Sequence, residues 1–292
     1  MKAGICLFIE NLSFEEDNLD ILTKILRLQE FVSKVCSDFK KFFRSNTFDQ
    51  KFIEFIMSTS SDHGGLMNEF YKIKSEVLDL NCENLQLLIN NTPPIHLGRL
   101  LSVYKDPLCT SPISGTTGFI ENEEDLILFC KGILENHPRS SEEYASAIQE
   151  VFKNIIFLDN PPYTFNAIDK MEGGYVNFLK GITEFLYFVN GYKIIPNDSL
   201  NNINAMKASL IYPVTPEGGG KNRRSIGELK RDFKVKGVIY KNINCEFHYK
   251  LEYEDGCNKT GTYRFNRIYF GFFNKIPTED PKIAIAHIGD HL

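Results

Sequence analysis

The clearest pattern in the chain lies at residues 243–253, where apolar and polar side chains alternate over eleven positions. The odd positions are apolar or aromatic, and the even positions are polar and include Glu246, His248 and Lys250. A period of two predicts a β-strand with one buried face. Alternate side chains lie about 6.5 to 7 Å apart along a strand, so these three groups can act on one substrate. A solvated face of an antiparallel sheet produces the same pattern, and taken alone that is its commoner origin.

Two further strands follow this one. The turn signal Asp255-Gly256 precedes a predicted strand at 263–273, which carries Arg264 and Arg267 among aromatic residues. A last strand at 282–288 leads into His287 and His291 at the end of the chain. Because chain ends fray unless they are held in place, an end formed by a strand and two histidines is expected to be held.

A helix is predicted just before these strands, at 225–233. It opens with Ser225 and Glu228 at the spacing of a capping box. Four cations lie at or near its first turns, namely Arg223, Arg224, Lys230 and Arg231. A helix N-terminus with arginines is a suitable seat for a phosphate.

The rest of the chain shows helical rather than strand periodicity. Apolar residues spaced by three and four predict an amphipathic helix at 17–44, and further helical patterns cover 66–90, 123–135, 142–157 and 175–189. A stretch rich in proline and glycine covers 211–220. The sequence therefore predicts an α+β protein. It has a mainly helical N-terminal domain (1–210), a linker (211–220) and a small antiparallel β-sheet domain with one preceding helix (221–292).

Charge separates the same two parts. The whole chain has 33 Lys and Arg against 38 Asp and Glu, whereas residues 221–292 have 14 against 9 and residues 1–220 have 19 against 29. A basic segment of +5 on an acidic body of −10 favours a polyanionic partner, because Lys and Arg gain affinity by releasing the counterions of phosphates. We expect RNA or DNA to bind the C-terminal domain.

Other features narrow the setting. No apolar run is long enough for a membrane span or a signal peptide, so we expect no membrane contact and a cytoplasmic location. The seven cysteines are scattered without CxxC spacing, which favours reduced thiols over disulfides or a zinc site. No metal and no cofactor are expected.

The residue types at 221–292 suit metal-independent RNA cleavage, which needs a base, an acid and cations that hold the phosphate. We assign His248 as one proton-transfer group and His291, or else His287, as the other. Lys250 and Arg267 would stabilise the phosphate, and Glu246 would be an alternative base or orient a histidine. The remaining cations would bind nucleic acid: Arg223, Arg224, Lys230, Arg231 and Arg264.

A family resemblance agrees with this assignment. The order of elements resembles the small ribonuclease domains of the barnase, EndoU, colicin and RelE type, in which a helix precedes an antiparallel sheet with basic and histidine residues. The strings CEFHYK (245–250), RIYF (267–270) and IGDHL (288–292) also look like a pattern of uncharacterised bacterial proteins from phage-defence and toxin neighbourhoods. The resemblance covers about 70 of the 292 residues. It implies a toxin or anti-phage endoribonuclease whose large domain binds a protein partner or activator.

Two alternatives stay open. A Mg²⁺-dependent restriction-type nuclease would place Glu-x-Lys where His248 and Lys250 stand, with Glu246 or Glu252 as a substitute carboxylate. A non-catalytic subunit that binds nucleic acid or a partner would use the same charges.

Overall fold

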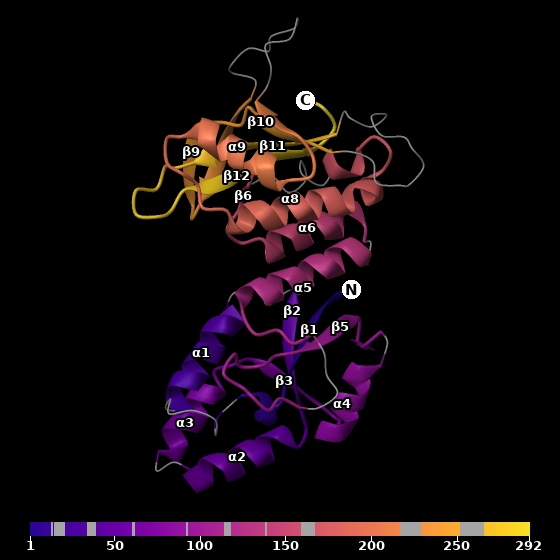
Figure 1. Ribbon diagram of the computed structural model, residues 1–292, viewed down its shortest axis with the longest axis vertical. Helices are drawn as coiled ribbons and strands as arrows, with labels where there is room; N and C mark the ends of the chain where they lie inside the picture. Colours follow the sequence, from indigo (N-terminus) through magenta and orange to yellow (C-terminus); the bar gives the residue numbers. More distant parts are fainter. Residues whose placement is uncertain are drawn as a thin grey trace, which may run out of the picture. The chain divides into compact units, whose positions relative to one another are not determined.

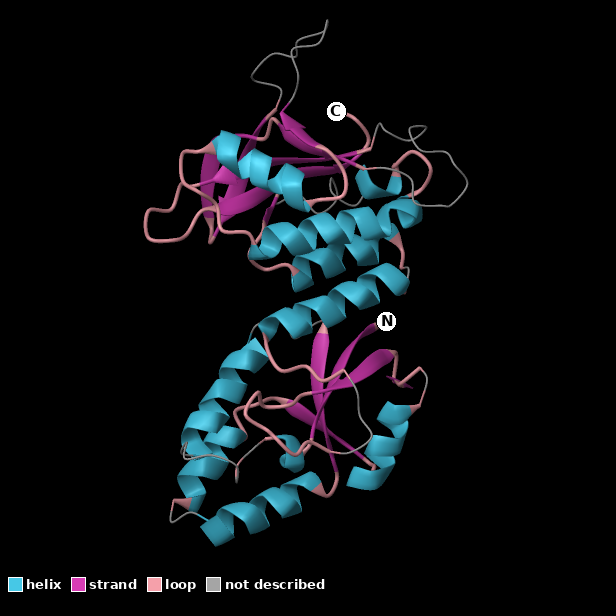
Figure 2. Ribbon diagram, in the orientation of Figure 1, coloured by secondary structure: helices cyan, strands magenta, loops and turns pink. Residues whose placement is uncertain are grey.

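The computed structural model describes residues 1–12, 14, 21–33, 39–59, 62–91, 93–113, 118–137, 139–158, 167–216, 229–251 and 266–292. The chain forms two compact units, Met1–Ile133 and Leu134–Leu292. Figure 1 labels many of their helices and strands, and Figure 2 colours them by type. None of the described helices has the length and apolar content needed to cross a membrane.

The N-terminal unit is built on a mixed sheet of five strands in the order β3-β2-β1-β5-β4. The first four are parallel to their neighbours, and β4 pairs antiparallel with β5. The strands are β1 (Lys2–Leu7), β2 (Lys40–Ser45), β3 (Ser75–Leu78), β4 (Ile95–His96) and β5 (Arg99–Val103). The helical segments are η1 (Ile9–Asn11), α1 (Ile21–Ser33), α2 (Phe48–Thr59), α3 (His63–Phe70) and α4 (Cys82–Asn90), with α5 (Glu123–Asn136) spanning the boundary between the units.

Helices cover both faces of this sheet (Figure 1). On the α1 side, Phe31 packs against Phe42 of β2, with ring centroids 6.1 Å apart. On the α4 side, Leu85 and Ile89 join one apolar cluster with residues of β1, β2 and β5, among them Phe43. Consecutive strands joined by helices on both faces give a doubly wound α/β unit, with its switch in strand order between β1 and β5.

The predicted fold class is therefore wrong, because the N-terminal half is α/β and not mainly helical. The predicted helix at 17–44 is a helix only at Ile21–Ser33 among its described residues, and Lys40–Ser45 is strand β2. The predicted helix at 66–90 holds the strand Ser75–Leu78 between α3 and α4. A parallel strand is buried on both faces and appears in the sequence as a short continuous apolar run. The phenylalanines of β2 were therefore interpreted as part of the apolar side of a helix.

The C-terminal unit contains a second five-stranded sheet, in the order β6-β12-β11-β10-β7. Its neighbours are antiparallel except for the parallel pair β6 and β12. The strands are β6 (Ile156–Phe157), β7 (Val214–Pro216), β10 (Phe247–Lys250), β11 (Arg267–Phe273) and β12 (Lys282–Gly289), beside a hairpin of β8 (Lys230–Val235) and β9 (Val238–Asn244). The helical segments are α6 (Ser141–Val151), η2 (Tyr175–Phe178), α8 (Leu179–Gly191) and α9 (Ser199–Ser209).

Both faces of this sheet are covered as well. On one face, Phe185 of α8 lies 4.8 Å from the ring of Tyr249 and 5.2 Å from that of Phe270. On the other face, Phe233 and Ile243 of the hairpin share an apolar cluster with residues of β11 and β12, including Tyr269. The even positions of β10 therefore do not lie on a solvated face.

The elements predicted for the C-terminal domain are partly confirmed and partly wrong. The last strand, predicted at 282–288, is confirmed as Lys282–Gly289. The predicted helix at 225–233 is wrong where it is described, because Lys230–Val235 is strand β8; its capping box lies outside the described residues. Within the predicted linker, Val214–Pro216 is strand β7, so the sheet includes strands from outside 221–292.

Candidate functional site

A row of rings crosses three neighbouring strands of the C-terminal sheet. His248 on β10 pairs with Tyr269 on β11, and Tyr269 pairs with His287 on β12. The ring of Tyr269 lies 5.5 Å from that of His248 and 6.0 Å from that of His287. The ring of His291, just beyond β12, is 6.2 Å from the same tyrosine. Three histidines, two of which lie four residues apart, therefore surround one fully buried ring.

Two cations occupy the adjacent row. Lys250 pairs with Arg267, and Arg267 pairs with Gly289. The side chain of Arg267 is buried and its Nη1 donates to the Asn266 carbonyl oxygen at 2.9 Å. Two buried or half-buried cations beside three imidazoles produce a positive site, which is suited to a phosphate.

His248 is the most strongly shifted member of the cluster. It is 5% exposed, and its Nε2 lies 2.9 Å from Oγ1 of Thr215 on β7. Burial, followed by the charges of Arg267, Lys250 and His291, lowers its pKa from 6.5 to about 4, while the Glu246 backbone opposes the shift. The ring is therefore neutral at pH 7 and able to accept a proton.

His287 and His291 differ from each other in exposure. His287 is 4% exposed, and its Nε2 lies 2.9 Å from the Asp290 carbonyl oxygen. A carbonyl only accepts, so this nitrogen is the donor. Burial lowers the pKa of His287, against the opposing effect of Asp290. His291 is exposed, with Nδ1 2.9 Å from the Leu292 main-chain oxygen.

The other predicted site residues fall in different places. Arg231 on β8 lies close enough to the cluster for its charge to lower the pKa of His287, a smaller effect than burial. Lys230 is exposed on the same strand. Glu246 lines a separate cavity with Phe247 and Phe272. Arg223, Arg224 and Arg264 lie outside the described residues.

Gly289 leaves space for His287. A Cβ at this position would lie 2.8 Å from the Ala167 carbonyl oxygen and 2.9 Å from Nε2 of His287. We expect Gly289→Ala to lower the free energy of unfolding by about 1–3 kcal/mol, because the added methyl overpacks a closed site. Chemical denaturation measures this, with Gly132→Ala as the control, since a Cβ at Gly132 meets no atom within 4 Å. Equal effects of the two substitutions would show that the packing at His287 tolerates the methyl.

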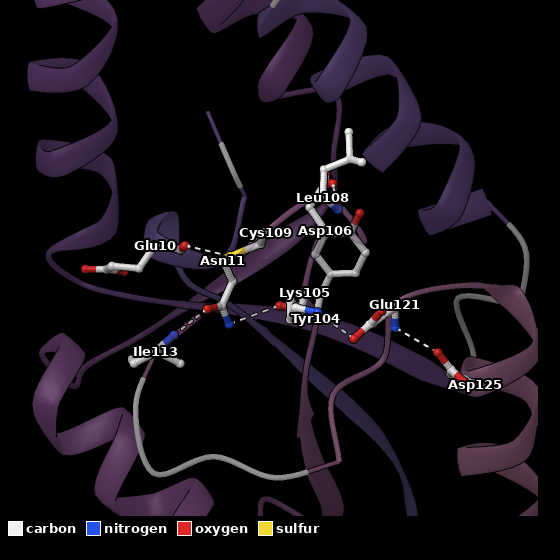
Figure 3. Close-up of polar contacts among 10 residues, drawn as sticks. All are labelled: Glu10, Asn11, Tyr104, Lys105, Asp106, Leu108, Cys109, Ile113, Glu121 and Asp125. Atoms are coloured by element: carbon white, nitrogen blue, oxygen red, sulfur yellow. Dashed lines mark hydrogen bonds and ion pairs between the residues drawn. The ribbon is translucent and has the colours of Figure 1, made fainter. Parts of the chain in front are cut away.

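The switch point of the N-terminal sheet is the other place where such a fold commonly binds a ligand. Its polar groups instead bind one another (Figure 3). Oδ1 of the fully buried Asn11 accepts from Ile113 N at 2.8 Å, and its Nδ2 donates to Tyr104 O at 3.3 Å. The buried Asp106 accepts from Leu108 N at 2.9 Å. This network ties the loops after β1 and β5 together, so we assign it a structural role.

The sequence prediction missed Thr215 and Tyr269, which complete the histidine site. Tyr269 is part of the RIYF string, but nothing in the sequence indicates that its ring lies between the histidines. Among the described residues, no group of three or more His, Cys, Asp and Glu side chains is arranged to hold a metal ion.

Comparisons with known proteins add no further constraint. No protein-family model matches the chain, and neither the curated proteins nor the solved structures contain a match. The resemblance to small ribonuclease domains stays a prediction. The function is therefore argued from the site alone.

Proposed function

We propose that the C-terminal unit is a metal-independent endoribonuclease. The observation that carries the proposal is the approach of His248 and His291 to the single ring of Tyr269, at 5.5 and 6.2 Å, beside Lys250 and Arg267. Two imidazoles next to two cations provide the groups that phosphodiester cleavage requires.

In this mechanism His248 is the base. Its ring is neutral at pH 7, and its pKa of about 4 makes it a weaker base than an ordinary histidine. It takes the proton of the 2'-hydroxyl, and the 2'-oxygen forms a bond to phosphorus. The bond from phosphorus to the 5'-oxygen breaks, and that oxygen takes a proton from His291. The products are a 2',3'-cyclic phosphate and a free 5'-hydroxyl, so no water and no redox partner enters this step.

The choice of His291 over His287 as the acid rests on the hydrogen bond by which His287 donates its Nε2 proton to a main-chain carbonyl oxygen. His291 is exposed at the end of the chain, whereas His287 is 4% exposed with Nε2 directed at the Asp290 carbonyl oxygen. We assign His287 a positioning role behind Tyr269. Lys250 and Arg267 bind the phosphate, and Arg231 and Lys230 of β8 extend the basic surface along the RNA.

The proposal extends to the biological role. An RNA-cleaving activity of this kind fits a toxin or an anti-phage effector. Residues 1–133 form a compact unit of their own, and we propose that this unit binds the protein partner or activator that controls the nuclease.

The test is cleavage of labelled single-stranded RNA by the full chain, in EDTA and in Mg²⁺. We expect cleavage in both, 2',3'-cyclic phosphate ends, and no cleavage of an otherwise identical strand with 2'-deoxyribose at every position. Cleavage only with Mg²⁺ would replace the proposal with a restriction-type mechanism. RNA bound but left intact would identify a binding subunit instead.

A further inference from the structure

A second polar site lies in the C-terminal unit, away from the histidines. It is a cavity of about 390 Å³ between the start of α9 and the strands β9, β10 and β11. Its volume falls in the lower part of the range of about 300–1,000 Å³ that is usual for small-molecule sites. Asparagines contribute to each side of it: Asn197, Asn202, Asn242, Asn244 and Asn274.

The α9 side of the cavity is held in place by Asn202. This buried amide accepts from Tyr192 Oη at 3.0 Å and from Ile195 N at 2.9 Å. It donates to Ile195 O and to Asp198 O, both at 2.8 Å. All four of its hydrogen-bonding positions are used, so Asn202 fixes the loop that forms the rim.

The strand side is fixed by a close backbone approach. A Cβ at Gly271 of β11 would lie 2.1 Å from the Asn244 carbonyl oxygen. The backbones of β11 and β9 therefore approach so closely here that only glycine fits. Asn197 and Asn242 also have φ angles of 59° and 57°. This is the left-handed region, which asparagine tolerates better than most residues, and it places both residues on the rim.

The groups exposed to the cavity are of two kinds. The side chains of Asn242 and Asn244 are exposed and line the cavity, and each carries a donor and an acceptor. The carboxylate of Glu246 only accepts. Phe247 and Phe272, with ring centroids 5.2 Å apart, add an aromatic surface.

We propose that this cavity binds one nucleobase with an exocyclic amino group. Amides pair with the donor and acceptor edge of a base, a carboxylate accepts from an amino group, and an aromatic ring stacks on the base. The inference is independent of the proposed function. Neighbouring residues of a strand point to opposite faces, so Phe247, which contacts Phe270, and His248, which contacts Tyr269, lie on opposite faces of the sheet.

Nucleoside binding tests the cavity. Equilibrium dialysis of the full chain against cytidine, adenosine, guanosine and uridine is expected to show at least one of the first three binding with a Kd below about 1 mM. Uridine, which has no exocyclic amino group, should bind about tenfold more weakly. Glu246→Gln should remove that preference, and Asn244→Ala should weaken binding of the preferred nucleoside by about tenfold, the loss of one hydrogen bond. Asn91→Ala, an exposed asparagine of the N-terminal unit, is the matched control.

The result is separable from the nuclease proposal because a nucleoside contains no phosphodiester to cleave. Absence of saturable binding up to about 10 mM, or equal binding by wild type, Asn244→Ala and Glu246→Gln, overturns the cavity assignment even if RNA is cut. Selective nucleoside binding together with intact RNA supports the cavity and rejects the catalytic part alone.

Discussion

His291→Ala is expected to reduce RNA cleavage by about 10²–10⁴-fold, the contribution typical of one proton-transfer group. The proposed reaction needs an acid to protonate the leaving 5'-oxygen, and His291 is the exposed imidazole of the cluster. The measurement is the single-turnover cleavage rate of labelled RNA. Because the side chain is exposed and follows the last strand, the substitution should leave the unfolding midpoint close to that of wild type.

Two controls separate chemistry from structure in this experiment. His137→Ala changes a partly exposed histidine outside the cluster and should cleave at the wild-type rate. Added imidazole should restore part of the activity of His291→Ala, since protonated imidazole from solution can supply the proton of the missing ring but cannot repair a packing defect. If His291→Ala keeps more than a tenth of wild-type activity, the proton-transfer role of His291 is refuted.

Local sequence patterns predicted the positions of the histidines only in part. Period-two alternation correctly placed His248 and Lys250 in one strand, and the third predicted strand correctly placed His287 in β12. The pairing of those strands through Tyr269 depends on register between residues about twenty positions apart, His248 with Tyr269 and Tyr269 with His287. Local periodicity contains no information about register across a long connection, which is why the central tyrosine was missed.

The burial of His248 was missed for a different reason. Polar residues at alternate positions of a strand predict a face in contact with water. In the structure, the hairpin of β8 and β9 packs on the face of the sheet that carries Tyr269, and His248 lies beside Tyr269 on that face. The hairpin itself was hidden, because Lys230 and Arg231 were interpreted as part of a helix. Glu246 does not share a strand with His248. Strand β9 ends at Asn244 and strand β10 begins at Phe247, so Glu246 lies in the connection between them.

The N-terminal fold was unpredictable from local windows. Strand β1 pairs in parallel with β5, for example Ala3 with Leu100, and also with β2, and only such long-range pairings create the parallel sheet. A buried parallel strand shows no alternation. The structural role of the buried Asn11 could not be predicted from the sequence either, because its side chain bonds to residues of the loop after β5, about a hundred positions away.

Acidification from pH 7 to pH 4 is expected to lower the free energy of unfolding by about 3 kcal/mol through His248 alone. The folded-state pKa is about 4 against an ordinary value of 6.5, with burial as the main cause. Between these two values the unfolded chain binds more protons than the folded chain, so stability rises with pH and is lost as pH falls through this window. His287 acts in the same direction, because its pKa is also lowered.

Comparison with His248→Gln isolates this effect from the carboxylates that also titrate in acid. Glutamine keeps a polar group that can reach Thr215 but has no charge to gain, so its stability should fall less between pH 7 and pH 4. Urea denaturation at each pH gives the wild-type and variant values, and their difference should change by about 3 kcal/mol over the range. The His137→Gln variant should follow wild type at every pH. A constant difference between wild type and His248→Gln would mean that His248 titrates as it does in the unfolded chain, and would refute the lowered pKa that burial and the neighbouring cations are expected to cause.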